Sequence, residues 1–196
     1  MENLLREISA CQICKDSLEL GPRPVLSAAE NSKIIIIGQA PGLAVHQSGV
    51  PWDDKSGDNL RMWMGVSKEE FYNPENIAIL PMGFCYPGKG KSGDLPPRKE
   101  CAPQWHHLIL SKMNQADLVL LIGNYAQKYY LKEQLNSNLT DTVRDFRAYL
   151  PNYFVLPHPS PRNNIWQAKN PWFKAEVLPE LQFQIGIILR GTNKGD

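Results

Sequence analysis

Two short segments carry the side chains most able to do chemistry. Residues 38–42 read Gly-Gln-Ala-Pro-Gly, and residues 156–164 read Leu-Pro-His-Pro-Ser-Pro-Arg-Asn-Asn. Glycines beside a proline allow close, fixed approach of the backbone, which suits N–H contacts to an anion or a carbonyl. Prolines stiffen the second segment, so His158 is predicted to be a hydrogen-bond donor that is positioned before a substrate arrives. Ser160 and Arg162 are residue types that contact phosphate.

Each segment also has a plainer interpretation. The first lacks the Gly-Lys-Ser/Thr end of a Walker loop and the Gly-x-Gly-x-x-Gly pattern, and it could simply be a tight turn after a strand. The second could be a proline-rich loop that carries an ordinary surface histidine. The pentapeptide alone does not separate the alternatives, whereas the neighbours of His158 favour a functional role.

Four apolar segments are predicted to be the strands that position these loops: residues 33–38, 76–82, 117–123 and 152–157. Nearly continuous apolar runs are typical of parallel strands that are covered on both faces. Helical patterns lie between them, so the sequence predicts an α/β protein. We expect a single-domain, three-layer α/β/α sandwich over residues 1–196 with a short four-stranded parallel sheet.

Three irregular, Gly- and Pro-rich loops begin just after predicted strands: residues 39–57, 86–103 and 157–170. Ligands of open α/β sheets bind at the carboxyl ends of the strands. We therefore expect the three loops to converge on one site.

Three details of the helices are also predicted. Ser67 and Glu70 form a capping box at the start of a helix. Residues 102–113 form a helix with one apolar face, made of Trp105, Leu108, Ile109 and Met113. A last helix begins near Pro171 and is kinked at Pro179.

Composition excludes several classes of protein. The chain is 42% hydrophobic and 21% charged with a net charge of +1, so any contact with nucleic acid must use a local basic patch. Its N-terminus lacks the apolar core of a signal peptide, and no apolar run approaches the ~18 residues that cross a bilayer. We expect a soluble, cytoplasmic monomer with no membrane partner.

The four cysteines are Cys11, Cys14, Cys85 and Cys101. In a chain of this length without a signal sequence, an opening Cys-x2-Cys favours metal or cluster binding over disulfides. All-cysteine ligation suits a [4Fe–4S] cluster or tetrahedral zinc equally on chemical grounds.

The two loop motifs, in this order and spacing, resemble the uracil-DNA glycosylase superfamily over most of the chain. The resemblance is closest to the iron–sulphur-containing bacterial and archaeal glycosylases. Their first motif is followed by an aromatic residue and a glycine where this chain has Trp52 and Gly57, and their cysteine spacing is similar. The resemblance favours the cluster over zinc, with a structural role.

The resemblance implies a role for each matching residue. Gln39 and Ala40 would offer backbone N–H groups to a flipped-out base, within a binding turn completed by Gly38, Pro41 and Gly42. Trp52 would stack on the base. His158 would donate to the base as negative charge develops on it, an interaction that usually dominates such catalysis. Ser160, Arg162 and Asn163 would contact the substrate DNA, whose damaged base must leave the stack to be reached.

Two departures from the family pattern bear on activity. Ala40 stands where many members have the Asp or Asn that orients the attacking water, so Asp54, Asp53 or His46 would have to supply a base. Pro81 stands where the family reads uracil with an asparagine, and Asn163 or Asn164 are the candidate substitutes.

Three functions therefore remain open. The first is a monofunctional DNA glycosylase that hydrolyses the N-glycosidic bond of uracil or another damaged base in single- or double-stranded DNA. The second is a catalytically inactive, nucleic-acid-binding or damage-sensing module with the same fold. The third is a small redox or zinc protein, which requires the His-Pro-Ser-Pro loop to be accidental.

Overall fold

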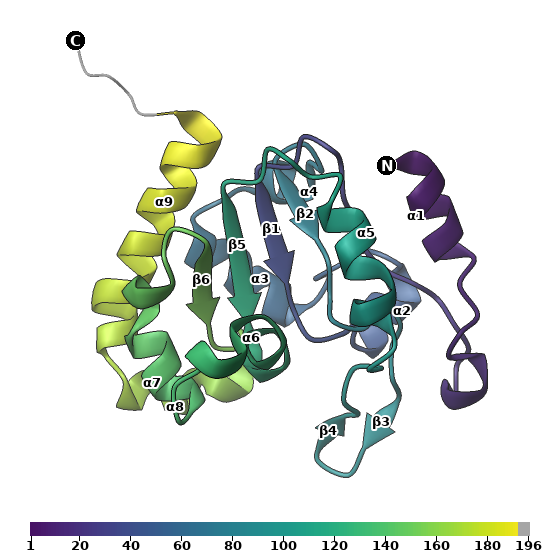
Figure 1. Cartoon of the computed structure of the whole chain (residues 1–196). Coiled ribbons are helices and arrows are strands. Elements are labelled where there is room, and N and C mark those ends of the chain that lie inside the picture. The colour runs from purple at the N-terminus through teal and green to yellow at the C-terminus, as the bar shows by residue number, and fades with distance from the viewer. Residues whose placement is uncertain (192–196) are drawn as a thin grey trace.

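The structure is a computed structural model, and it describes residues 1–191. Its centre is a sheet of four parallel strands in the order β2-β1-β5-β6 (Figure 1). The strands are β1 (Ile34–Ile37), β2 (Ile77–Ile79), β5 (Leu118–Ile122) and β6 (Tyr153–Leu156). The α/β fold and the four predicted strands are confirmed. Residues 192–196 of the predicted domain lie outside the described part of the chain.

Helices cover both faces of this sheet. In Figure 1, α5 (His107–Leu110) and α6 (Gly123–Leu131) lie on one face, and α3 (Lys55–Met64) lies on the other, where it packs against α9 (Leu178–Arg190). The smaller helices are α1 (Glu2–Ser9), α2 (Leu43–Ser48), α4 (Lys68–Tyr72), α7 (Leu139–Arg144) and α8 (Asn164–Lys169). All four isoleucines of β1 are buried, as expected of a strand enclosed between two helical layers.

A buried glutamine ties the two strands that lead to the His158 loop. Gln127 of α6 donates from its amide nitrogen to the carbonyl oxygens of Leu121, at 3.3 Å, and Leu156, at 2.9 Å. One side chain therefore fixes the carboxyl ends of β5 and β6 relative to each other.

The helix predicted over residues 102–113 is built differently from the expectation. It starts as a π-helical turn, Ala102–His106, and becomes α-helical only at His107. A π turn holds more residues than an α turn, so it changes the phase of the side chains that follow. Trp105, Ile109 and Met113 are buried as predicted, but Leu108 is turned outward and exposed.

Of the two other predictions about helices, the capping box is confirmed and the kink at Pro179 takes another form. The capping box of Ser67 and Glu70 is confirmed, with both hydrogen bonds formed. The last helix has a π-helical turn at Phe173–Val177, and Pro179 lies in the first turn of α9 that follows. The helix runs without a break from residue 172 to residue 190, so Pro179 is preceded by helical residues and removes one N–H donor from its interior. The irregularity predicted at Pro179 therefore takes the form of a change of helix type just before it.

A two-stranded hairpin projects from the body of the protein beyond the carboxyl ends of the strands (Figure 1). It consists of β3 (Lys89–Gly90) and β4 (Gly93–Asp94), which pair antiparallel. Among the described residues, every helix is too short or too polar to cross a membrane.

Candidate active site

The three predicted loops meet around one cavity of about 450 Å³. It lies where the chain leaves the carboxyl ends of β1, β2 and β6. The first loop contributes residues 38–42 and Trp52, the second contributes Lys89 and Asp94, and the third contributes His158, Ser160 and Arg162. The predicted convergence is confirmed, because segments more than 100 residues apart in sequence line the same space.

The turn after β1 presents its backbone to this cavity. Its carbonyl groups are occupied, since Met82 N–H donates to Gly38 O at 2.9 Å and Gly83 N–H donates to Gln39 O at 3.0 Å. The N–H groups of Gln39 and Ala40 make no hydrogen bond with any described residue. Both residues are half-buried and line the cavity, so these two N–H groups are available to a ligand.

Trp52 is held in an unusual backbone conformation beside that turn. Its φ is 57°, in the left-handed region that non-glycine residues rarely adopt. Its carbonyl oxygen accepts hydrogen bonds from Arg61 Nη1 at 3.4 Å and from the Tyr72 hydroxyl at 3.3 Å. A Cβ on Gly57 would come within 1.8 Å of the same oxygen. Two donors and a required glycine therefore fix this tryptophan.

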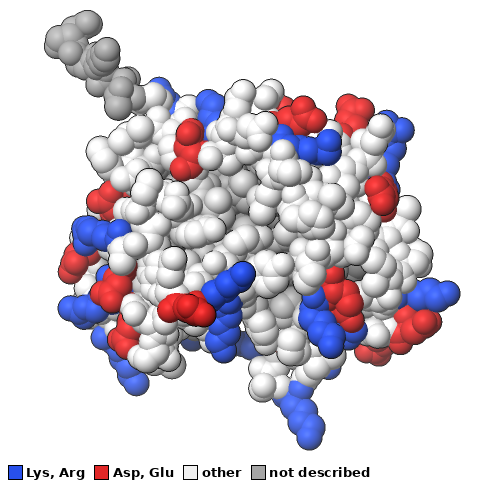
Figure 2. Space-filling view, in the orientation of Figure 1, with Lys and Arg blue, Asp and Glu red and all other residues white. Residues whose placement is uncertain are grey.

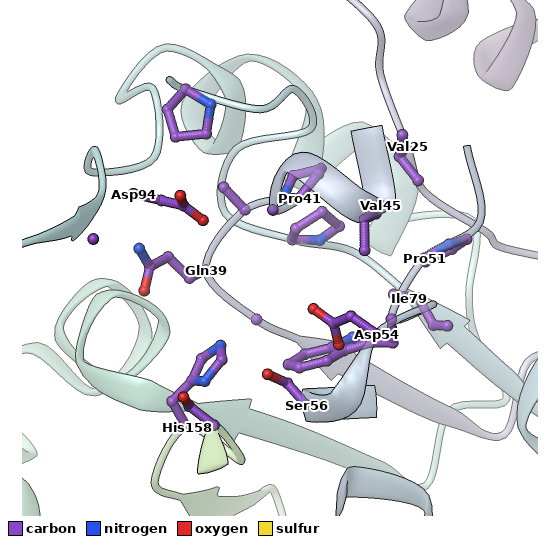
Figure 3. A pocket seen from close by; sticks show the side chains of 18 of the residues that line it. Val25, Gln39, Pro41, Val45, Pro51, Asp54, Ser56, Ile79, Asp94 and His158 are labelled. Atoms are coloured by element: carbon purple, nitrogen blue, oxygen red, sulfur yellow. The ribbon is translucent and has the colours of Figure 1, made fainter. Parts of the chain in front are cut away.

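The indole of Trp52 closes one wall of the cavity. A Cβ on Gly38 would lie 2.9 Å from its Cζ2 atom, so only glycine lets the ring approach the turn this closely. The ring centroids of Trp52 and His158 are 5.6 Å apart, and the two planes are inclined at 35°. Figure 3 shows the His158 ring pointing into the same cavity.

Two asparagines fix the loop that carries His158. Asn163 donates from its amide nitrogen to the carbonyl oxygen of His158 at 2.6 Å. Asn59, from α3, donates likewise to the carbonyl oxygen of Pro159 at 2.8 Å. Together with Pro157 and Pro159, these bonds leave the imidazole little freedom. Burial lowers the pKa of His158, against the opposing charges of Asp54 and Asp94, so the ring is neutral at pH 7.

A family comparison agrees with this geometry. The family model of the uracil DNA glycosylase superfamily matches residues 25–182, which include every loop around the cavity. The chain belongs to the uracil DNA glycosylase superfamily. The match covers most of the described chain and begins after the Cys-x2-Cys segment.

The three candidate bases named from the sequence lie at different positions relative to the cavity. Asp54 lines the cavity and also caps α3, because its Oδ1 accepts the Gly57 N–H at 2.8 Å. Asp53 is exposed and His46 is buried, and neither lines the cavity. Burial lowers the pKa of His46, with a smaller contribution from the charge of Arg23. Of the three candidate bases, the structure brings only Asp54 to the site.

Asn163 lies differently from the other residues named for substrate binding. It is outside the cavity lining, and its amide holds the backbone of His158. Its role as a substrate contact stays a prediction, whereas its contact with the loop is a feature that the sequence did not suggest.

The position where the superfamily resemblance led us to expect a base-reading asparagine is occupied by Pro81, and its carbonyl oxygen is already engaged. His106 Nε2 lies 3.1 Å from that oxygen, and His106 Nδ1 lies 2.6 Å from the Tyr130 hydroxyl. A carbonyl can only accept, so the Nε2 atom carries the proton and Nδ1 accepts from Tyr130. Burial lowers the pKa of His106 to about 4, which keeps this bridge neutral.

The four cysteines gather at a second, small cavity on the hairpin side of the sheet. Cys11, Cys14, Cys85 and Cys101 line it together with apolar groups and Arg98. Burial raises the pKa of Cys85 to about 11 and of Cys101 to about 12, as expected of thiols in apolar surroundings. Among the described residues, no three His, Cys, Asp or Glu side chains are grouped to hold a single ion.

Sequence reasoning missed several residues that line or support the cavity. Ser56, Lys89 and Asp94 line it. Asn59, Arg61 and Tyr72 support it from behind. None belongs to a motif, and only the predicted convergence of residues 86–103 on the site could have singled out Asp94.

Proposed function

We propose that this protein is a monofunctional DNA glycosylase that hydrolyses the N-glycosidic bond of a damaged base. The observation that carries the proposal is the placement of a neutral, rigidly held His158 in a cavity that also contains two free backbone N–H groups and an aromatic wall. A base inside a duplex cannot be reached, so the substrate nucleotide must rotate out of the stack into this cavity.

The cavity has a part for each stage of that reaction. The Trp52 ring is placed to stack on an extruded base, an interaction worth ~1–3 kcal/mol. The N–H groups of Gln39 and Ala40 and the imidazole of His158 then donate to the oxygen on which negative charge develops as the bond breaks. Because these donors are fixed before the base arrives, little reorganisation accompanies the reaction.

Water activation is assigned to Asp54. Ala40 has no polar side chain, and Asp54 is the only one of the predicted bases that reaches the cavity. One of its oxygens accepts the Gly57 N–H, which leaves the other to orient a water molecule.

Arg162 and the β3–β4 hairpin are proposed to contact the DNA backbone. Arg162 and Lys89 line the cavity mouth, and a Cβ on Gly93 would lie 3.5 Å from Arg162 Nη1, so the hairpin and the His158 loop meet there. Figure 2 shows acidic and basic side chains interspersed over the face in view, with a basic side chain projecting at the bottom, where the hairpin lies in Figure 1. This distribution supports a local phosphate contact rather than a field over the whole surface.

The four cysteines are proposed to hold a structural [4Fe–4S] cluster, as in the iron–sulphur-containing subgroup. Four thiols with no carboxylate among them are a soft donor set that suits iron–sulphur or zinc. The resemblance to that subgroup favours the cluster over zinc, and the cluster would tie the N-terminal segment to the loop before α5. Anaerobically purified protein should contain iron and acid-labile sulphide in equal amounts, and zinc alone would contradict this.

Base release tests the glycosylase directly. Labelled single- and double-stranded oligonucleotides that contain uracil, hypoxanthine, xanthine or 5-hydroxymethyluracil would be incubated with anaerobically purified protein. Release of any base establishes the activity. Borohydride should trap no protein–DNA adduct, because a monofunctional enzyme forms no Schiff base. Trapping that is lost in Lys89→Ala would instead show that this cavity lysine makes the enzyme bifunctional.

The second candidate is a binding module without activity. The side chains of Ala40 and Pro81, at the positions where the family pattern has polar groups, favour it. Specific binding to damage-containing oligonucleotides without base release, by folded protein with its cluster intact, would establish this alternative.

A further inference from the structure

The cavity wall next to β2 offers no side chain that could recognise a base. Ile79 and Pro81 line it there, and the carbonyl oxygen of Pro81 faces the Nε2 donor of His106 at 3.1 Å. A glycosylase that selects its base needs hydrogen-bonding groups against the base edge, since a site without them discriminates weakly. Recognition must therefore come from another wall.

Asp94 supplies an acceptor on such a wall. It lies at the end of β4, opposite Lys89 in the hairpin register, and the hairpin is closed by a 2.9 Å bond from Leu95 N–H to Gly88 O. Its Oδ2 would be 3.5 Å from a Cβ on Gly42, so the turn after β1 leaves room for the carboxylate. Within the described chain Asp94 forms no salt bridge.

Figure 3 shows where this carboxylate points. Asp94 and the side-chain amide of Gln39 both line the cavity and extend toward one another from different loops, and the ring of His158 lies on the other side of Gln39 in this view. An ionised carboxylate only accepts hydrogen bonds, whereas an amide can donate through its nitrogen. Together they present an acceptor beside a donor, from two side chains that belong to different loops.

We propose that Asp94, with the Gln39 side chain as its donor partner, reads the edge of a base that has a ring N–H next to a carbonyl. This inference rests on the proposed glycosylase function and names the side chains that determine its specificity. Uracil, hypoxanthine and xanthine have such an edge: the ring N–H donates to Asp94, and the adjacent carbonyl accepts from Gln39. These are the bases that deamination produces from cytosine, adenine and guanine.

The same pair rejects the amino bases from which uracil and hypoxanthine arise. Cytosine and adenine have a bare ring nitrogen at the corresponding position, and its lone pair would face the carboxylate of Asp94. Asp94 is exposed in the structure, so the bound nucleotide must cover its carboxylate; two facing acceptors are then both left unsatisfied, which disfavours these bases. Thymine and guanine share the N–H/carbonyl edge, so their exclusion must depend on other contacts.

The test measures preference rather than rate alone. Wild type, Asp94→Ala and Asp94→Asn would be compared on matched oligonucleotides that contain uracil, N3-methyluracil or cytosine, with Ser92→Ala at the exposed hairpin tip as the control. Loss of a hydrogen bond to a charged group predicts a fall of roughly 10- to 100-fold in kcat/KM for uracil in Asp94→Ala. N3-methyluracil has no ring N–H, so Asp94→Ala should not be impaired further on that base.

Asp94→Asn gives the decisive result. An asparagine amide can turn its N–H₂ toward a bare ring nitrogen, so this variant should narrow the uracil-to-cytosine preference at least tenfold, whereas Ser92→Ala should keep it. A purely structural role for Asp94 would lower excision of every base equally and leave that ratio unchanged. An unchanged ratio in Asp94→Asn overturns the inference.

Binding separates failure of the inference from failure of the proposed function. Oligonucleotides with 2′-fluoro nucleotides resist cleavage of the glycosidic bond, so the affinity for strands that contain 2′-fluoro-2′-deoxyuridine can be compared with the affinity for strands that contain 2′-fluoro-2′-deoxycytidine, without base release. A wild-type preference that Asp94→Ala abolishes supports the inference even if no base is ever released. If base is released but the Asp94 variants keep the wild-type preference for uracil over cytosine in both excision and binding, the proposed glycosylase function is supported and the role of Asp94 in specificity is wrong.

Discussion

The amide of Asn163 donates a 2.6 Å hydrogen bond to the backbone carbonyl of His158, five residues before it. The bond closes the proline-rich loop on itself, and the Asn59 amide anchors the same loop to α3. The imidazole therefore faces the cavity because of contacts to its backbone, not because of a partner on its ring.

Asn163→Ala should slow base release with little change in DNA affinity. Loss of one well-formed hydrogen bond costs ~1 kcal/mol, and in a preorganised site we expect about a 5- to 10-fold fall in single-turnover rate. Asn152→Ala, which is exposed and precedes β6 at the opposite end of that strand, is the matched control. A larger loss of binding than of rate would show that Asn163 contacts DNA, as the sequence suggested.

His158→Ala should lower base release far more than binding. A preorganised donor to a developing oxyanion contributes ~10²- to 10³-fold to the rate. The exposed His107 provides the control, and His107→Ala should behave as wild type. Single-turnover rates and equilibrium binding to the same oligonucleotide make the comparison, and equal losses in both would remove His158 from its assigned role.

Gly57→Ala should disturb Trp52 and destabilise the fold. The added Cβ would come within 1.8 Å of the Trp52 carbonyl oxygen, so the residue that forms the cavity wall must move. Overpacking of this kind costs ~1–3 kcal/mol of unfolding free energy, and base release should fall with it. Gly186→Ala, in the middle of α9 with its nearest neighbour atom at 4.0 Å, should be neutral or stabilising.

His106 should make stability depend on pH. Burial lowers its pKa to about 4 from an ordinary value of 6.5, so the unfolded chain binds a proton more readily than the folded one. This contribution to the unfolding free energy is fully present above pH 6.5 and is lost as the pH falls toward 4. The full difference is about 3 kcal/mol.

Urea unfolding between pH 7 and pH 4 measures that slope. His106→Gln, which keeps a side-chain donor near Pro81 but has no titrating group, should be less stable at pH 7 and should show a shallower slope. The same slope in both proteins would assign the pH dependence to other groups.

Much of the fold could be predicted from the sequence because its strands are enclosed. The isoleucines of β1 and the apolar runs of β2, β5 and β6 have no polar face, and only a parallel sheet between two helical layers buries such strands. Pro179 and the Ser67/Glu70 capping box were likewise readable, since both act through local backbone chemistry. Leu108 was wrongly predicted to be buried, because no local sequence pattern predicts the π turn at Ala102–His106. That turn rotates the following side chains around the helix axis and leaves Leu108 exposed.

For the site, the sequence by itself determined the rigid parts: the glycine–proline turn at residues 38–42 and the histidine held between prolines at 158. Their stiffness comes from residues adjacent in the chain. Only the tertiary structure decided which other side chains share the cavity. It brought in Asp94 from a hairpin, left out Asp53 and His46, and placed Arg61 and Tyr72 behind Trp52. Those relationships depend on how separate loops pack against one sheet edge, and no spacing along the chain encodes them.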